Sequence, residues 1–265
     1  MSAASKHAVA ELALHLADNA LILGQRNAEW CGHGPILEED LALANNALDL
    51  IGQARLLYQH VVELRQDGSS EDSLAYFRDA SAFLNFTLVE LPHSTALAPT
   101  STADRDYAVT ITRNFLYSAW MVLLWDMLQA AQDAHIAAIA SKSLKEARYH
   151  FQHARDWLIR FGDGTAESHH KAQAALQHLM PYTQEFWSDS PMVESGFTAL
   201  GLPPIATLKA PWEALVADTL AEATLSLPPV GGYITQGKHG VHSEHMGFLL
   251  AEMQGLARQH PGASW

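Results

Sequence analysis

The spacing of apolar residues constrains this sequence most, because they recur every three or four positions through most of its 265 residues. This spacing places them on one face of an α-helix, whereas a half-buried β-strand needs them at every second position. We find no convincing alternating segment followed by a hairpin turn. The sequence therefore predicts an all-α protein made of long helices.

Residues that favour turns divide the periodic sequence into helices. Glycine and proline interrupt it near residues 30–35, 67–70, 92 and 162–165. We predict long helices over residues 6–27, 35–64, 71–90, 102–132 and 135–161, then shorter ones over 166–187, 211–226 and 243–258. Loops are expected over 188–204 and 228–240. The connection after residue 132 is so short that the helices on its two sides are expected to pack antiparallel.

These helix lengths suit a large bundle, and we expect one helical domain over residues 1–265. Its core bundle is expected over about 36–161 and a helical extension over about 166–265, since no linker, low-complexity tract or repeat is visible. In the helix over 35–64, the residues expected to face inward are Leu41, Ala44, Leu48 and Ile51, with Leu57 as a further candidate.

The composition excludes several classes of protein. Apolar residues make up 48% and charged residues 17% of the chain, which is typical of a folded globular protein. The net charge of −13 argues against binding to nucleic acid phosphates or to an anionic membrane surface. The longest apolar stretch, 119–125, is far shorter than the ~20 residues that cross a bilayer. With the single cysteine Cys31 and no visible targeting segment, we expect a soluble cytoplasmic protein.

Carboxylates inside a helical bundle invite a test for the di-iron carboxylate pattern. This pattern needs a carboxylate from each of two helices and Glu-x-x-His from each of two others, because positions three apart point to the same side of a helix. Glu-x-x-His occurs at 90–93, with Pro92 between the two ligands, and at 167–170, in a first helical turn. Neither pair lies in the middle of a predicted helix.

A better-placed pair is Glu146 and His150, which share a helix face although their spacing of four exceeds the pattern by one. The alternative is that such carboxylates pair with nearby Arg, His or Tyr side chains, as buried carboxylates usually do. We favour this alternative, so neither a catalytic residue nor a metal site is expected. The degenerate ligand candidates are Asp49, Glu90, His93, Asp126, Glu146 and His150.

Three further groups of residues leave a functional and a structural interpretation open. Lys145, Arg148 and Arg155 share one helix face, and they could contact an acidic partner or phosphates, or form a solvated face with local ion pairs. His242 and His245 could chelate a metal, but their spacing specifies no third ligand, which favours a surface or helix-start role. The aromatic residues Tyr117, Trp120 and Trp125 are expected in the core rather than around a ligand.

Several longer strings resemble one known family over nearly the full length of the chain. The sequence resembles the structural-subunit (PaaC) family of the bacterial multicomponent phenylacetyl-CoA epoxidase. The strings that carry the resemblance are Ala28–His33 (AEWCGH), Asp40–Asn45 (DLALAN), Leu48–Arg55 (LDLIGQAR), Lys145–His150 (KEARYH), Gly240–His245 (GVHSEH) and Leu250–Gln254 (LAEMQ).

The resemblance implies a ferritin-like fold and a place in the monooxygenase complex of phenylacetate degradation. A homologous catalytic subunit would hold the di-iron centre, activate O2 and epoxidise the aryl-CoA substrate. A reductase with flavin and an iron–sulfur cluster would supply electrons from NADPH. This chain would hold no cofactor and would support the catalytic subunit within a hetero-oligomer. In that setting Lys145, Arg148 or Arg155 would contact the partner or the phosphates of coenzyme A.

Two other functions compete with this one. The chain could be a di-iron oxygenase or oxidase in its own right, which the incomplete ligand set argues against. It could also be a ferritin-like iron store, but nothing in the sequence indicates an iron entry route, an oxidation site or a closed cage.

Overall fold

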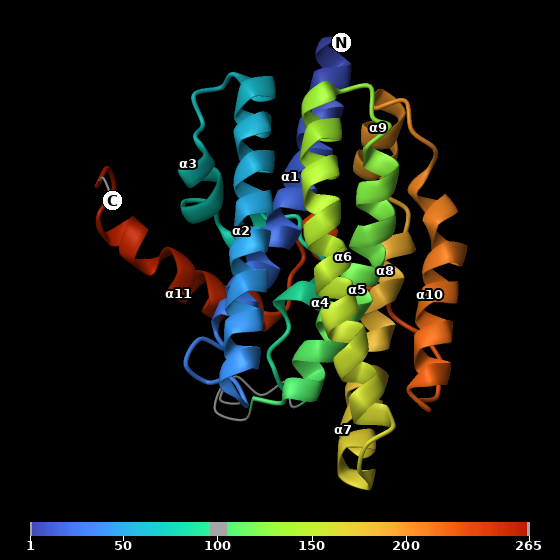
Figure 1. Ribbon diagram of the computed structural model, residues 1–265. Helices are drawn as coiled ribbons and strands as arrows, with labels where there is room; N and C mark the ends of the chain where they lie inside the picture. Colours follow the sequence, from blue (N-terminus) through green and yellow to red (C-terminus); the bar gives the residue numbers. More distant parts are fainter. Residues whose placement is uncertain (1, 96–104, 264–265) are drawn as a thin grey trace. The chain divides into compact units, whose positions relative to one another are not determined.

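The computed structural model describes residues 2–95 and 105–263, and these residues are helical with turns between the helices (Figure 1). Within this part of the chain, the β-type pairing consists of one isolated antiparallel bridge between Gln236 and Val241. The predicted fold class, all-α with the long helices of a ferritin-like protein, is confirmed. None of the described helices is both long enough and apolar enough to cross a membrane.

The chain divides into two compact units. The first contains the residues up to Leu91 and those from Gln236 onwards. Its helices are α1 (Ala3–Ala28), α2 (Leu37–Arg65), α3 (Glu71–Tyr76), α4 (Thr87–Glu90) and α11 (Glu244–Gln259), with 3₁₀ turns at Ala80–Ala82 and Gly237–His239. The long helices α1 and α2 pack side by side as an antiparallel pair, because only a short loop joins them (Figure 1).

The second unit runs from Pro92 to Thr235. Its helices are α5 (Tyr107–Leu128), α6 (Ala134–Gly162), α7 (Ala166–Leu179), α8 (Gln184–Trp187), α9 (Pro191–Ala199) and α10 (Lys209–Glu222), with 3₁₀ turns at Met180–Thr183 and Ile205–Leu208. The side chain of Asp133 accepts hydrogen bonds from the amides of His135 and Ile136, which fixes the start of α6 directly after the turn. The predicted antiparallel packing of α5 and α6 is confirmed (Figure 1).

The prediction of one helix over 71–90 is wrong, because polar side chains of α1 bind the backbone of this segment. The carboxylate of Asp18 accepts the amide N–H of Leu84, and the side-chain oxygen of Asn19 accepts the amide N–H of Phe86. These donors are therefore satisfied without a helical ladder. The segment forms α3, a short 3₁₀ turn and α4 instead.

Other predicted boundaries also need correction. Helix α9 lies inside the expected loop over 188–204 and begins with Pro191, a residue that suits a first helical turn. The helix expected over 166–187 changes to 3₁₀ geometry where Pro181 lies in the first turn of the new segment. Of the helix expected over 102–132, residues 102–104 lie outside the described residues.

The predicted inner face of α2 is largely wrong. Leu41, Leu48 and Ile51 are exposed, whereas Leu57 is buried as predicted. The face that packs inward is rotated about the helix axis from the predicted one. It consists of Leu43, Ala47, Leu50, Ala54 and Leu57. The single domain over 1–265 with a core at about 36–161 stays a prediction, although α1, which lies before residue 36, packs against α2 in the first unit.

We expect Gly162→Ala to lower the free energy of unfolding by about 1–3 kcal/mol, because the new methyl group would overpack the second unit. A Cβ atom at this position would lie 1.9 Å from the carbonyl oxygen of Ala223, which is backbone and cannot rotate away. Urea unfolding measures the change. Gly247→Ala is the control, since it lies in α11 with nothing within 4 Å of its Cβ, and it is expected to stabilise by about 0.5–1 kcal/mol. Equal midpoints for Gly162→Ala and wild type would contradict this close packing.

Candidate functional site

The carboxylate of Glu90 is the best-defined polar centre of the first unit. Glu90 is fully buried at the end of α4. One carboxylate oxygen accepts from the side chains of Asn85, at 2.9 Å, and His242, at 2.6 Å. The other accepts from the amide of Ser243 at 2.6 Å. Both oxygens therefore have hydrogen-bond partners within the chain.

The ring of His242 connects this carboxyl group to the backbone of another segment. Its Nδ1 faces Glu90, and its Nε2 lies 2.9 Å from the carbonyl oxygen of Phe83. The carbonyl oxygen of Phe83 accepts hydrogen bonds, and the ring of His242 links it to the carboxyl group of Glu90. This contact is buried, with the side chain of His242 4% exposed. Of the surface or helix-start role expected for His242 and His245, the surface part is wrong, because both side chains are buried, whereas the helix-start part is confirmed, because α11 begins at Glu244.

A second buried carboxylate, Asp18 of α1, lies in the same unit. It accepts from the hydroxyl of Tyr58 at 2.6 Å and from both terminal nitrogens of the Arg78 guanidinium. Burial and the negative charge of Asp18 raise the pKa of Tyr58 well above its ordinary value, so this hydroxyl stays protonated and donates. The guanidinium also lies 4.1 Å from the ring centre of Phe83. This cluster balances its own charge and fixes the chain near Leu84.

In the second unit, the predicted ligand candidates have separate surroundings. His93 is buried, and its Nδ1 lies 2.7 Å from the Thr110 hydroxyl and 3.0 Å from a nitrogen of Arg113. Asp126 lies on the surface, 3.6 Å from Arg148. On α6, Glu146 lies 3.6 Å from Lys142, and His150 is buried with its ring edge against Tyr149.

The candidates do not assemble into a ligand set within the described part of either unit. In the second unit, no three of the described residues His93, Asp126, Glu146 and His150 lie close enough to share a metal ion. In the first unit, Asp49 is half-buried on α2, and Glu90 is already committed to Asn85, His242 and Ser243.

The basic residues of α6 differ in how freely they could reach a ligand. Lys145 and Arg148 are exposed, and Arg148 forms an ion pair with the exposed carboxylate of Asp126. Arg155 is half-buried and forms a short ion pair with Glu222 of α10. The aromatic residues of α5 are core residues instead: Tyr117, Trp120 and Trp125 are buried, and burial raises the pKa of Tyr117.

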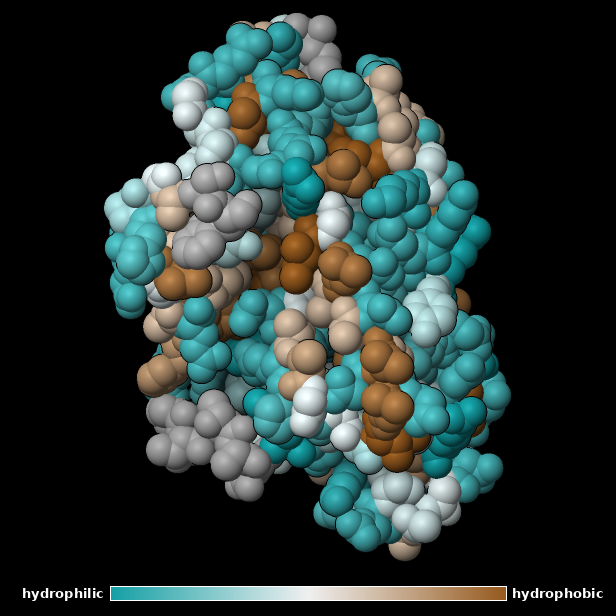
Figure 2. Space-filling view, turned by 60° about the vertical axis from the view of Figure 1, so that its left-hand side comes forward, coloured by the Kyte–Doolittle hydropathy of each residue, from teal (hydrophilic) through white to brown (hydrophobic). Residues whose placement is uncertain are grey.

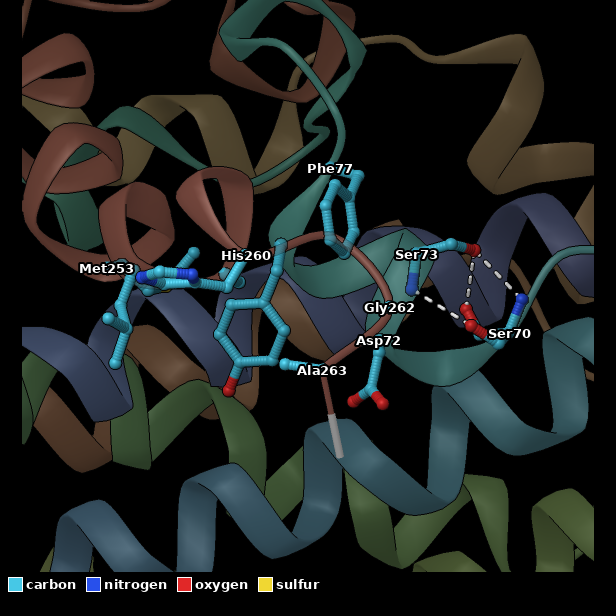
Figure 3. A pocket seen from close by; sticks show the side chains of 11 residues that line it. Ser70, Asp72, Ser73, Phe77, Met253, His260, Gly262 and Ala263 are labelled. Carbon is cyan, nitrogen blue, oxygen red and sulfur yellow. Dashed lines mark hydrogen bonds between the residues drawn. The ribbon is translucent and has the colours of Figure 1, made fainter. Parts of the chain in front are cut away.

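A cavity of about 810 Å³ opens between α3 and the C-terminal end of α11 in the first unit (Figure 3). Its apolar lining includes Tyr76, Phe77 and Met253. The polar side chains of Ser70 and Ser73 on its rim bind each other's backbone amides as a capping box, as the dashed lines in Figure 3 show. These hydroxyls therefore serve the start of α3.

Comparison with known proteins assigns the chain to a family. Residues 1–265 match the family described as "Phenylacetic acid catabolic protein". The chain belongs to this family. Within it, the chain resembles the component designated C of the 1,2-phenylacetyl-CoA epoxidase of Escherichia coli (strain K12). The two are 44% identical over 253 residues, which cover 95% of this chain and 97% of the relative. The family resemblance predicted from the sequence strings is thereby confirmed.

His15 gives this family member a buried histidine whose charge state differs between the folded and unfolded chain. It lies on α1 with its Nδ1 2.6 Å from the carbonyl oxygen of Leu84. Burial lowers its pKa from 6.5 to about 4, with smaller contributions from the positive charges of Lys238 and His239, against the hydrogen bond to Leu84, which raises it. The folded protein therefore holds His15 neutral at pH 7.

We predict that His15 makes the protein less stable in mild acid. Because its pKa is lower in the folded state, the unfolded chain binds a proton first, and stability is lost as the pH falls from 6.5 towards 4. Between pH 7 and pH 5, the free energy of unfolding of wild type should fall by about 2 kcal/mol more than that of His15→Gln, as measured by urea unfolding. His7→Gln, an exposed position on the same helix, is the control. Identical pH dependence in wild type and His15→Gln would refute the assignment.

Proposed function

We propose that this chain is the PaaC-type component of a phenylacetyl-CoA epoxidase in phenylacetate catabolism, and that it acts as a structural subunit. The observation that carries the assignment is the 44% identity to the Escherichia coli component over almost the whole of both chains. The match of the whole chain to the phenylacetic acid catabolic family supports it. A di-iron oxygenase active in its own right is not favoured.

The surroundings of Glu90 support the non-catalytic role. In di-iron bundles, the carboxylates that project inward bind iron. Here the carboxylate contacts the ring of His242, an amide side chain and a backbone amide, so both of its oxygens already have partners within the chain. No step of the reaction is assigned to this chain. A homologous di-iron subunit would carry out the oxygen chemistry on the aryl-CoA substrate, and a reductase with flavin and an iron–sulfur cluster would deliver electrons from NADPH.

The test is the iron content of the isolated chain and of its complex, after anaerobic reconstitution with ferrous iron. We expect no stoichiometric iron on this chain alone, because its ligand candidates are committed to internal partners. The complex with the catalytic subunit is expected to hold about two irons per catalytic chain. About two tightly bound irons on the isolated chain would instead make it an enzyme of the di-iron class. Failure to assemble with the other epoxidase components would refute membership in the complex.

The basic face of α6 is proposed to contact either an acidic surface of the catalytic subunit or the phosphates of coenzyme A. Lys145 and Arg148 support this proposal, since both side chains are exposed and the ion pair of Arg148 with Asp126 lies at the surface. Arg155 is the weakest member, because Glu222 already neutralises it.

Replacing Lys145, Arg148 and Arg155 together by alanine should weaken assembly or raise the KM for the aryl-CoA substrate by about tenfold, since charge-assisted hydrogen bonds are lost. Sedimentation of the complex and steady-state kinetics separate the two effects. Lys171→Ala is the control, because this exposed residue pairs locally with Glu167. Unchanged assembly together with unchanged KM in the triple variant would remove these residues from the interface.

A further inference from the structure

Helix α2 carries a second apolar stripe that the described residues leave exposed. Leu37 is 71% exposed, Leu41 56%, Leu48 68% and Ile51 37%, and the half-buried Ala44 lies between them. We call these five residues the α2 seam. Figure 2 brings forward the side of the molecule that carries α2 and shows hydrophobic patches exposed there among hydrophilic residues. A contiguous apolar surface of this kind on a globular protein marks an interaction site.

The spacing of the seam indicates what kind of element covers it. Its residues follow one another at intervals of four, three, four and three positions. This is the 3.5-residue repeat with which one helix packs lengthwise against another. The inward face of α2, which includes Leu43, Leu50 and Leu57, is fully used in the first unit. Helix α2 is therefore apolar on two sides, and its exposed side is shaped for a further helix.

Charges beside the seam distinguish between the candidate partners. The exposed Glu38 lies beside Leu37 and the half-buried Asp49 beside Leu48. The first turn of α2 is acidic as a whole, with Glu38, Glu39 and Asp40. A second copy of this chain would bring a second net charge of −13 to this acidic surface. A helix with Lys or Arg beside its apolar residues would complement them.

We propose that the α2 seam is the docking surface for a helix of another epoxidase subunit, one that carries a matching apolar 3.5-residue repeat flanked by basic residues. This inference rests on the proposed function, since it takes the partner from the epoxidase complex. The surface needs no rearrangement of this chain, because α1 already holds α2 in place from the other side. The leucines of the seam supply the buried apolar centre of the contact, and Glu38 supplies its charged rim.

The test compares two double variants of the full chain in binding to the remaining epoxidase subunits. Leu41→Lys with Leu48→Lys places two charges in the seam. The control, Leu227→Lys with Val230→Lys, changes two exposed apolar residues outside α2, which are 60% and 45% exposed. We expect the seam variant to stay folded, with an unchanged melting temperature, and to bind on the order of 100-fold more weakly. The control should bind within about twofold of wild type. The affinity of the Glu38→Gln variant for these subunits should depend less on salt concentration than the affinity of wild type does.

The outcomes distinguish failure of the seam alone from failure of the proposed function. If wild type assembles and the seam variant assembles equally well, the seam is not the docking surface while the proposed function stands. Equal weakening in the control variant would also overturn the seam. If wild type forms a homodimer and the seam variant does not, the occupant of the seam is a second copy of this chain and not a basic helix of another subunit. A wild-type chain that binds no epoxidase subunit would overturn the proposed function and the seam together.

Discussion

A carboxylate removed from water must receive hydrogen bonds from the protein, and the first unit is organised around this requirement at Glu90. The carboxylate takes donors from Asn85, five residues before it, and from His242, which is 152 positions away in sequence. Removing one partner of such a pair leaves an uncompensated buried charge, which costs several kcal/mol. The network therefore holds the C-terminal segment against α4. Nearby glycines allow close contact, since a Cβ at Gly237 would lie 2.5 Å from the carbonyl oxygen of Asn85.

The same network shows how the carboxyl group of Glu90, a residue in a di-iron-like motif, is satisfied by groups of the chain itself. Iron neutralises inward-facing carboxylates in metal-binding bundles. In this chain the ring of His242 contacts the carboxyl group of Glu90, and its second nitrogen lies 2.9 Å from the carbonyl oxygen of Phe83. The Asp18 cluster repeats this solution with the guanidinium of Arg78. Buried carboxylates are thus retained, but their partners are side chains that tie distant parts of the chain together.

Local patterns predicted most of the helices and the antiparallel packing of α5 and α6, because periodicity and turn residues act over a few positions. The predictions that were wrong depend on contacts between residues far apart in the sequence. Asp18 and Asn19 prevent a helix at 84–86 from positions more than sixty residues earlier. The pairing of Glu90 with His242 leaves no spacing signal in either segment. On α2 both stripes are apolar, so composition alone could not tell Leu43, which is buried, from Leu41, which is exposed.

This ambiguity on α2 is itself informative about function. A helix that serves only its own core keeps polar residues on its outer face, because exposed leucines gain nothing there and favour aggregation. In α2 the outer face carries leucines at the spacing of a helix-packing repeat, while the interior of the unit carries carboxylates whose oxygens already have partners within the chain. Both features fit a protein that contributes surfaces rather than reacting groups to its complex. The polar chemistry of the first unit stabilises the chain, and its unused apolar area lies where a partner can reach it.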